Sequence, residues 1–243
     1  PDIGVKSGIK RTFGSIYVGV GGLMLDSKPN LLGMLQGAMT APLGLRLHGA
    51  HWNEVPSMAG AASGLPLPPG KIAEAYASAH VVLGVTVEAQ RQYGMINNRV
   101  FEALACGCIL VSDHSPQLED LFGEFLLFAN DSAGVAAAIT RVIDDPDWAN
   151  HRRVAGRTAI LRAHTWAHRV VDMLSFYHEL RWEKGLHVPR FQVGFSPSTP
   201  TALAPGDSPR KRATRSRLLW VVSASLRSTS DYVFVVAHIL GLL

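Results

Sequence analysis

Short apolar runs alternate with helical patterns along the first half of the chain. Runs of four to six mostly apolar residues predict strands over 15–20, 43–47, 80–85, 108–112 and 125–128. Apolar residues at helical spacing predict helices between the strands, over 30–38, 71–79, 97–105 and 116–122. Because strands that alternate with helices form parallel sheets, the pattern predicts an α/β fold with a doubly wound parallel sheet.

Three further helices are predicted after the last strand, over 131–144, 147–163 and 166–183. Asp131 or Ser132 is expected to cap the first of them, which ends before Pro146. The last helix is amphipathic and is expected to close the domain.

The predicted sheet also indicates where a ligand would bind. In open parallel sheets, ligands bind beyond the carboxyl ends of the strands. Four loops leave strands on that edge, over 19–26, 48–53, 86–95 and 113–115. The sequence therefore predicts a single site there.

The segment 93–113 carries the most informative chemistry. Gly94 lies in a loop that leads into a helix, and the unpaired N–H groups of a helix start attract phosphate. Arg99 and Glu102 are three residues apart and share one helical face. Arg99 can meet a phosphate while Glu102, expected to be partly enclosed by apolar neighbours, accepts hydrogen bonds from sugar hydroxyls.

Each of these residues also has an ordinary structural interpretation. Asn97 and Asn98 are good helix caps, and capping uses the same N–H groups as phosphate binding. Arg99 could form a surface ion pair with Glu102. Glu102 could be a solvent-facing helix former.

Other candidate ligand contacts come from the neighbouring loops. Gly19, Gly21 and Gly22 follow the first strand and would let the backbone approach a phosphate or a sugar. His48 and His51 follow the second strand and are candidate contacts to phosphate or sugar. Aromatic side chains can stack on a base or sugar or simply pack, and this applies to Tyr93 and Trp52.

No metal site is expected. The spacing of the histidines, among them His114, His164 and His168, supplies no compact zinc set. Cys106 and Cys108 flank Gly107 in a turn where a disulfide between them is unfavourable, which favours a reducing compartment.

Composition divides the chain into four parts. An unstructured start (1–12) precedes a globular domain (13–184), a linker rich in Pro, Ser and basic residues (185–217) and an apolar tail (218–243). The net charge of +4 is concentrated in the basic run at 210–217, so no nucleic-acid partner is expected. Arg227 and Asp231 interrupt the tail, which favours a membrane-surface helix or a tail that docks on a partner over a spanning helix, with a disordered tail as the alternative. The protein is expected to be cytoplasmic, with membrane association at most through this tail. Without an initiator Met or a signal peptide, the chain is expected to be a fragment or a processed product.

The run from Asn97 to Gly107, followed by Asp113, resembles the C-terminal half of GT-B glycosyltransferases, closest to the CgeB-type branch. The likeness covers about residues 13–182 and includes 164–169 in the closing helix. It implies a Rossmann-like half of a GT-B enzyme, of hexosyl type, that transfers a sugar from a nucleoside-diphosphate sugar to a glycan, protein or lipid acceptor. It implies no cofactor beyond that donor substrate, and a missing N-terminal domain.

The resemblance also assigns roles. Glu102 matches the glutamate that binds the ribose of the sugar nucleotide, and Arg99 with the amides of Asn97 and Asn98 would hold the diphosphate. A second family glutamate, which faces the donor sugar, would fall at Gly94 and is absent; Glu88 is nearby in sequence. No catalytic residue is identified.

Two alternatives remain open. The chain could be a non-catalytic nucleotide-binding or interaction domain derived from a glycosyltransferase, as the missing glutamate suggests. A different α/β nucleotide or NAD domain is disfavoured, because the spaced glycine fingerprint is absent.

Overall fold

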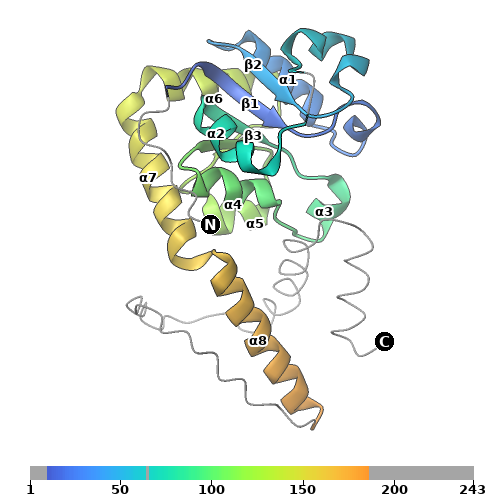
Figure 1. Cartoon of the computed structure of the whole chain (residues 1–243), viewed down its shortest axis with the longest axis vertical. Coiled ribbons are helices and arrows are strands. Elements are labelled where there is room, and N and C mark those ends of the chain that lie inside the picture. The colour runs from blue at the N-terminus through green and yellow to red at the C-terminus, as the bar shows by residue number, and fades with distance from the viewer. Residues whose placement is uncertain (1–9, 64–65, 186–243) are drawn as a thin grey trace. The chain divides into compact units, whose positions relative to one another are not determined.

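The fold is built around one five-stranded parallel sheet (Figure 1). The computed structural model describes residues 10–63 and 66–185. All pairings in the sheet are parallel, and its order is β2-β1-β3-β4-β5. The strands are β1 (Phe13–Val18), β2 (Leu45–His48), β3 (Ala79–Gly84), β4 (Ile109–Ser112) and β5 (Leu127–Phe128). The predicted α/β fold with a parallel sheet is confirmed.

Helices connect the strands in the predicted sequence. The α-helices are α1 (Leu31–Thr40), α2 (Ile72–Ala77), α3 (Glu88–Gln92), α4 (Asn98–Ala105), α5 (Pro116–Phe122), α6 (Ser132–Asp144), α7 (Pro146–Ala163) and α8 (Trp166–Glu183). The 3-10 helices are η1 (Gly22–Leu25), η2 (Trp52–Glu54), η3 (Pro56–Ala61) and η4 (Pro69–Lys71). The short α3 and the 3-10 helices were not predicted, because they are too short for an apolar period. Asp131 is the cap of α6, since its carboxylate accepts a hydrogen bond from Gly134 N at 2.7 Å.

Side chains alternate between the two faces of the sheet. Tyr17, Leu47, Val81 and Val111 share one core with α1 and α6, which pack against each other. In the three central strands β1, β3 and β4, Ile16, Val82 and Leu110 are also fully buried and point to the opposite face, where α2 and α4 contact the sheet. Burial on both faces explains the continuous apolar runs in the sequence.

The chain divides into two compact units, 1–161 and 162–243. The described part of the second unit contains α8, in which Arg169 pairs with Asp172 at 3.0 Å. The predicted linker, the apolar tail and most of the predicted unstructured start lie outside the described residues. Within the described residues, no helix is long and apolar enough to cross a membrane.

Two glycines of α1 test the packing of this helix on α6. A Cβ at Gly37 would lie 2.1 Å from the Ser132 carbonyl oxygen, whereas a Cβ at Gly33 would meet nothing within 4 Å. We expect Gly37→Ala to lower the free energy of unfolding by about 1–3 kcal/mol through overpacking. The matched control Gly33→Ala should raise it by about 0.5–1 kcal/mol. Urea denaturation measures both, and equal effects would contradict the packing.

Candidate functional site

The order of the strands marks one position on the carboxyl edge. From β1 the chain moves to β2 on one side, and then returns to β3 on the other side of β1. Ligands of doubly wound sheets bind where the connections diverge in this way, here at the ends of β1 and β3. Because all pairings are parallel, the four predicted loops do leave the same edge.

The start of α4 is fixed at this position by Asn97. Its Oδ1 accepts a hydrogen bond from Arg99 N at 2.8 Å, and its Nδ2 donates to the carbonyl oxygen of Val85, just after β3, at 3.3 Å. Val100 N donates to the Asn97 carbonyl oxygen at 3.1 Å. The capping role of Asn97 is therefore confirmed, and two amides of the first turn are engaged within the protein. Asn98 is exposed at the same helix start.

Arg99 connects α4 to the end of β1. Its Nη2 donates to the Val18 carbonyl oxygen, and its guanidinium lies 4.6 Å from the centroid of the Tyr17 ring. It also hydrogen-bonds Tyr76 of α2. Burial opposes the charge of the guanidinium, but Tyr17 and Tyr76 outweigh burial and raise the pKa of Arg99. Arg99 is therefore a fixed cation.

One donor of this cation is unused. Arg99 Nε is enclosed and has no hydrogen-bond partner within the described residues. No ion pair is formed there between Arg99 and Glu102, so the surface-pair interpretation of Arg99 is not supported. The predicted contact of Arg99 with a diphosphate stays a prediction.

Glu102 lies one turn further along α4 and is exposed. The expectation that it is partly enclosed was wrong: Ala103 and Leu104 are buried, but they point toward the sheet and Glu102 does not. Besides burial, which has the largest effect on both groups, the charge of Glu102 helps to raise the pKa values of Arg99 and Tyr76, so Glu102 lies on the side of α4 that is near α2. An exposed carboxylate beside a fixed cation is open to a ligand, and ribose binding stays a prediction.

The loops that follow β1 and β2 are joined to each other. Gly19 N donates to the His48 carbonyl oxygen at 2.8 Å, and Gly21 N donates to the Ala50 carbonyl oxygen at 3.0 Å. Trp52 Nε1 donates to the Gly19 carbonyl oxygen at 2.8 Å. The amides of Gly19 and Gly21, predicted to approach a phosphate, are therefore engaged in this contact.

Gly22 differs from the other two glycines. It begins η1 with a φ of 58°, and a Cβ there would lie 2.9 Å from Glu54 Oε2. The first N–H groups of a helix have no partner within the helix. Gly22 is thus the residue of this loop whose backbone best fits the predicted ligand contact.

Both predicted histidines of the second loop have an oriented ring. Ser63 Oγ donates to the Leu47 carbonyl oxygen at 2.6 Å, so it accepts from His48 Nδ1 at 2.6 Å. Partial burial, helped by Arg46, lowers the pKa of His48 and favours the neutral ring. His51 Nδ1 lies 2.6 Å from Glu54 Oε1, and its backbone is left-handed with a φ of 68°. In both rings, Nε2 has no hydrogen-bond partner among the residues described.

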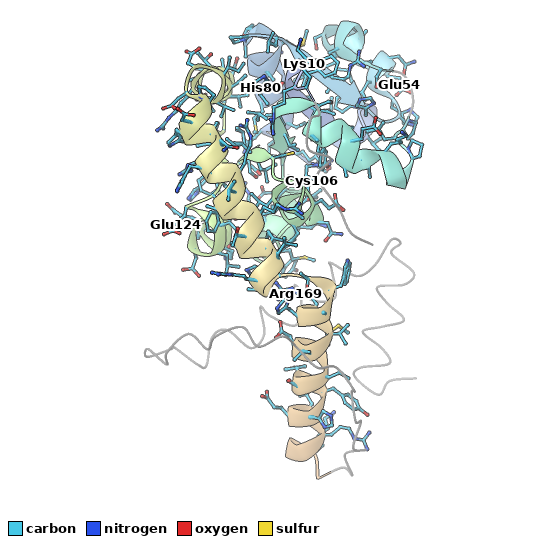
Figure 2. All side chains as sticks on the ribbon, turned by 60° about the vertical axis from the view of Figure 1, so that its left-hand side comes forward. Lys10, Glu54, His80, Cys106, Glu124 and Arg169 are labelled. Atoms are coloured by element: carbon cyan, nitrogen blue, oxygen red, sulfur yellow. The ribbon has the colours of Figure 1, made fainter. Side chains whose placement is uncertain are left out.

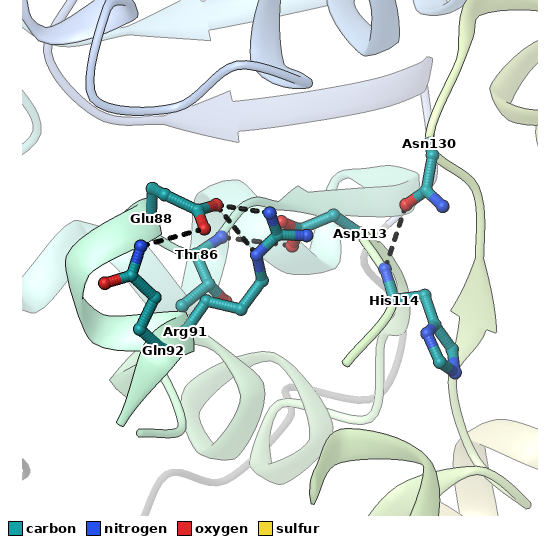
Figure 3. Close-up of polar contacts among 7 residues, drawn as sticks. All are labelled: Thr86, Glu88, Arg91, Gln92, Asp113, His114 and Asn130. Atoms are coloured by element: carbon teal, nitrogen blue, oxygen red, sulfur yellow. Dashed lines mark hydrogen bonds and ion pairs between the residues drawn. The ribbon is translucent and has the colours of Figure 1, made fainter. Parts of the chain in front are cut away.

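The loop that follows β3 contains Gly94, the position at which the second family glutamate is missing. Gly94 has a φ of 67°, and a Cβ there would lie 3.0 Å from the Gln117 side chain. A carboxylate at this position would be both strained and crowded. Glu88 does not replace it, because its carboxylate pairs with Arg91 and accepts from Gln92 at 3.4 Å (Figure 3). Tyr93 is 67% exposed and available for stacking, whereas Trp52 is buried in packing.

Several polar residues lie together at the ends of β3, β4 and β5, and they were not predicted as site residues from the sequence (Figure 3). Asp113 is 2% exposed, and its Oδ1 accepts from Thr86 N at 3.0 Å and from Ser112 Oγ at 3.3 Å. His114 N donates to Asn130 Oδ1 at 3.0 Å. An aspartate directly after a buried strand on the carboxyl edge was the signal that could have identified this group.

Residues that could bind a metal ion do not form a cluster in the described part of the chain. No group of three His, Cys, Asp or Glu there could hold a metal ion. Cys106 and Cys108 are buried free thiols, and burial raises their pKa values to about 11 and about 12.

Asp113 predicts a pH-dependent stability. Burial raises the pKa of Asp113 above 3.8, so the folded state binds its proton more readily than the unfolded state does. The ionised Asp113 therefore lowers the free energy of unfolding of the wild type at neutral pH, and this loss of stability disappears as pH falls toward 3.8. Asp113→Asn keeps the acceptor for Thr86 N and should be at least as stable as wild type at pH 7, with an advantage that shrinks in acid.

Chemical denaturation of both proteins across pH measures this advantage. Asp113→Ala serves as the comparison, because it leaves a buried N–H unpaired at a cost of about 1–3 kcal/mol. An advantage of Asn that grows toward acid would contradict the raised pKa.

Three solved structures are similar to this chain, and the first of them supports the fold. Sucrose-phosphate synthase from Thermosynechococcus elongatus matches with a TM-score of 0.54 and 18% identity, over 70% of this chain and 46% of that one. A T4 phage BGT mutant in complex with UDP-glucose matches at 0.49 and 14%, over 63% and 44%. The catalytic domain of cholesterol-alpha-glucosyltransferase from Helicobacter pylori matches at 0.47 and 13%, over 62% and 98%. The chain thus spans less than half of the first two structures.

The family is shown by sequence. Comparison with curated proteins gives no match. The sequence model of the glycosyl transferase-like family, however, matches residues 32–175, which is more than half of the chain and runs from within α1 to within α8. The chain therefore belongs to the glycosyl transferase-like family.

Proposed function

We propose that the chain is the donor-binding half of a GT-B glycosyltransferase, of hexosyl type and CgeB-like, which transfers a sugar from a nucleoside-diphosphate sugar. The observation that carries the proposal is that α4 presents a fixed cation and, one turn further along, an exposed carboxylate with which it forms no ion pair in the described part of the chain. These residues are Arg99 and Glu102, and α4 begins where the strand order diverges. Family membership and the fold support the same function.

Each part of the sugar nucleotide has a suited partner. The diphosphate would lie near Arg99, in the first turn of α4, and near Gly22, at the start of η1, where a cation and the Gly22 amide would stabilise negative charge on the leaving group. Glu102 would accept hydrogen bonds from the ribose hydroxyls. Tyr93 would stack on the base. His48 would accept a hydrogen bond from a sugar hydroxyl through Nε2, because its neutral ring carries the proton on Nδ1, and His51 would contact a phosphate or the sugar through Nε2.

The chemistry proposed needs no group beyond the donor substrate. The chain supplies positive charge and orientation, while the acceptor would bind to a second domain. We therefore expect this chain alone to bind a nucleotide sugar weakly and to transfer its sugar little or not at all. Neither a metal nor an organic cofactor is part of the proposal.

A second candidate function rests on Gly94. Its left-handed backbone, and the closeness of the Gln117 side chain, disfavour at this position the acid that faces the donor sugar in related enzymes. The domain would then bind a nucleotide or a partner without catalysis. Binding of a nucleotide sugar without hydrolysis, measured with the complete protein that contains this domain, would favour this candidate.

Isothermal titration of UDP, GDP and their sugars tests the proposed site. Glu102→Gln should weaken binding by about tenfold, because it removes hydrogen bonds to a charged acceptor. Glu124→Gln is the matched control, since Glu124 is exposed and lies before β5, at the other edge of the sheet. Equal affinities of the two variants, or no binding by the wild type, would contradict the proposal.

A further inference from the structure

Two arginines meet at the amino edge of the sheet, opposite the proposed sugar-nucleotide site. Arg11 precedes β1, and the hydrogen bond from Thr12 N to the Ser78 carbonyl oxygen, at 2.8 Å, holds this segment beside the start of β3. Arg153 of α7 donates through Nη2 to the His80 carbonyl oxygen of β3 at 3.3 Å. The charges of both arginines act on His80 and on Cys108.

Neither guanidinium has a counter-ion within the described residues. No carboxylate pairs with Arg11 or Arg153 there. Arg153 is only 8% exposed, and the Nε atoms of both arginines are enclosed without a hydrogen-bond partner. Two adjacent cations with unused buried donors are unfavourable unless an anion accompanies them.

The neighbouring groups do not offset this charge. Burial raises the pKa of Cys108 to about 12, so its thiol is neutral. Burial, and then the charge of Arg153, lower the pKa of His80. Burial, and then Arg11, also lower the pKa of Arg153 to about 10, which leaves it charged at neutral pH. The pair thus carries two positive charges.

We propose that Arg11 and Arg153 form a binding site for a phosphate dianion, separate from the sugar-nucleotide site. The Nε–H and an Nη–H of a guanidinium form the edge that binds phosphate oxygens in a bidentate way, and Nε is the atom left unpaired in both arginines. A dianion balances two guanidinium groups, whereas a single carboxylate leaves one charge over. Lys10, which is exposed and directly precedes Arg11 in the chain, adds a further positive charge (Figure 2).

Arg11 provides the entry to the site. It is half-buried and lies outside any helix or strand, whereas Arg153 is almost fully buried, so Arg11 is the side of the site nearer to solvent. Arg153, held by the His80 carbonyl oxygen on a long helix, is the fixed side of the site.

Titration calorimetry of inorganic phosphate into the full chain, with UDP at saturating concentration and constant ionic strength, tests the site. We expect saturable binding, weakened about tenfold or more by Arg11→Gln. Arg152→Gln is the matched control, since Arg152 is the neighbour of Arg153 on α7 but donates to the Leu126 carbonyl oxygen. Arg153→Gln should weaken binding as Arg11→Gln does, and Arg11→Gln carries the test if Arg153→Gln does not fold.

A second arm distinguishes the sources of the phosphate. Methyl phosphate that binds as well as inorganic phosphate indicates a phosphomonoester ligand, and selective binding of inorganic phosphate indicates the free ion; both support the site. The proposal is overturned if wild type shows no saturable binding, or if Arg11→Gln binds phosphate as wild type does. If Arg11→Gln binds UDP with the affinity of the wild type, the sugar-nucleotide site is intact, and a loss of phosphate binding is then due to the Arg11–Arg153 site alone.

Discussion

The hydrogen bond from Arg99 to the Val18 carbonyl oxygen determines how the carboxyl edge of this sheet is built. It joins the first turn of α4 to the end of β1, while Asn97 joins the same turn to the end of β3. These are the two strands between which the order of the sheet reverses. A charged side chain and a helix start are thereby held at the position where such sheets bind ligands, and Tyr17 and Tyr76 keep the charge in place.

The same constraint explains which neighbours can contact a ligand. The loops after β1 and β2 use the amides of Gly19 and Gly21 to hold each other, so glycine is required there by loop packing. The groups that stay available for a ligand are Gly22, Tyr93 and the Nε2 atoms of His48 and His51. The opposite edge has a different character, because the positive charges of Arg11 and Arg153 meet there without a carboxylate among the described residues.

Strands, long helices and their order could be predicted because each follows from a local period, and Asn97 could be predicted as a cap from its residue type. The exposure of Glu102 could not, since it depends on the rotation of α4 against the sheet. Asp113 and the Arg11–Arg153 pair depend on contacts between residues distant in sequence, such as Asp113 with Thr86. Such contacts leave no periodic signal.

A crystal structure of the chain with a nucleoside diphosphate tests the central claim most directly. The account predicts the diphosphate at the start of α4, with a phosphate oxygen within about 3.2 Å of Arg99 or of Gly22 N, and Glu102 at the ribose. A diphosphate bound at another edge of the sheet, or a Glu102 carboxylate that faces only solvent in the complex, would contradict it.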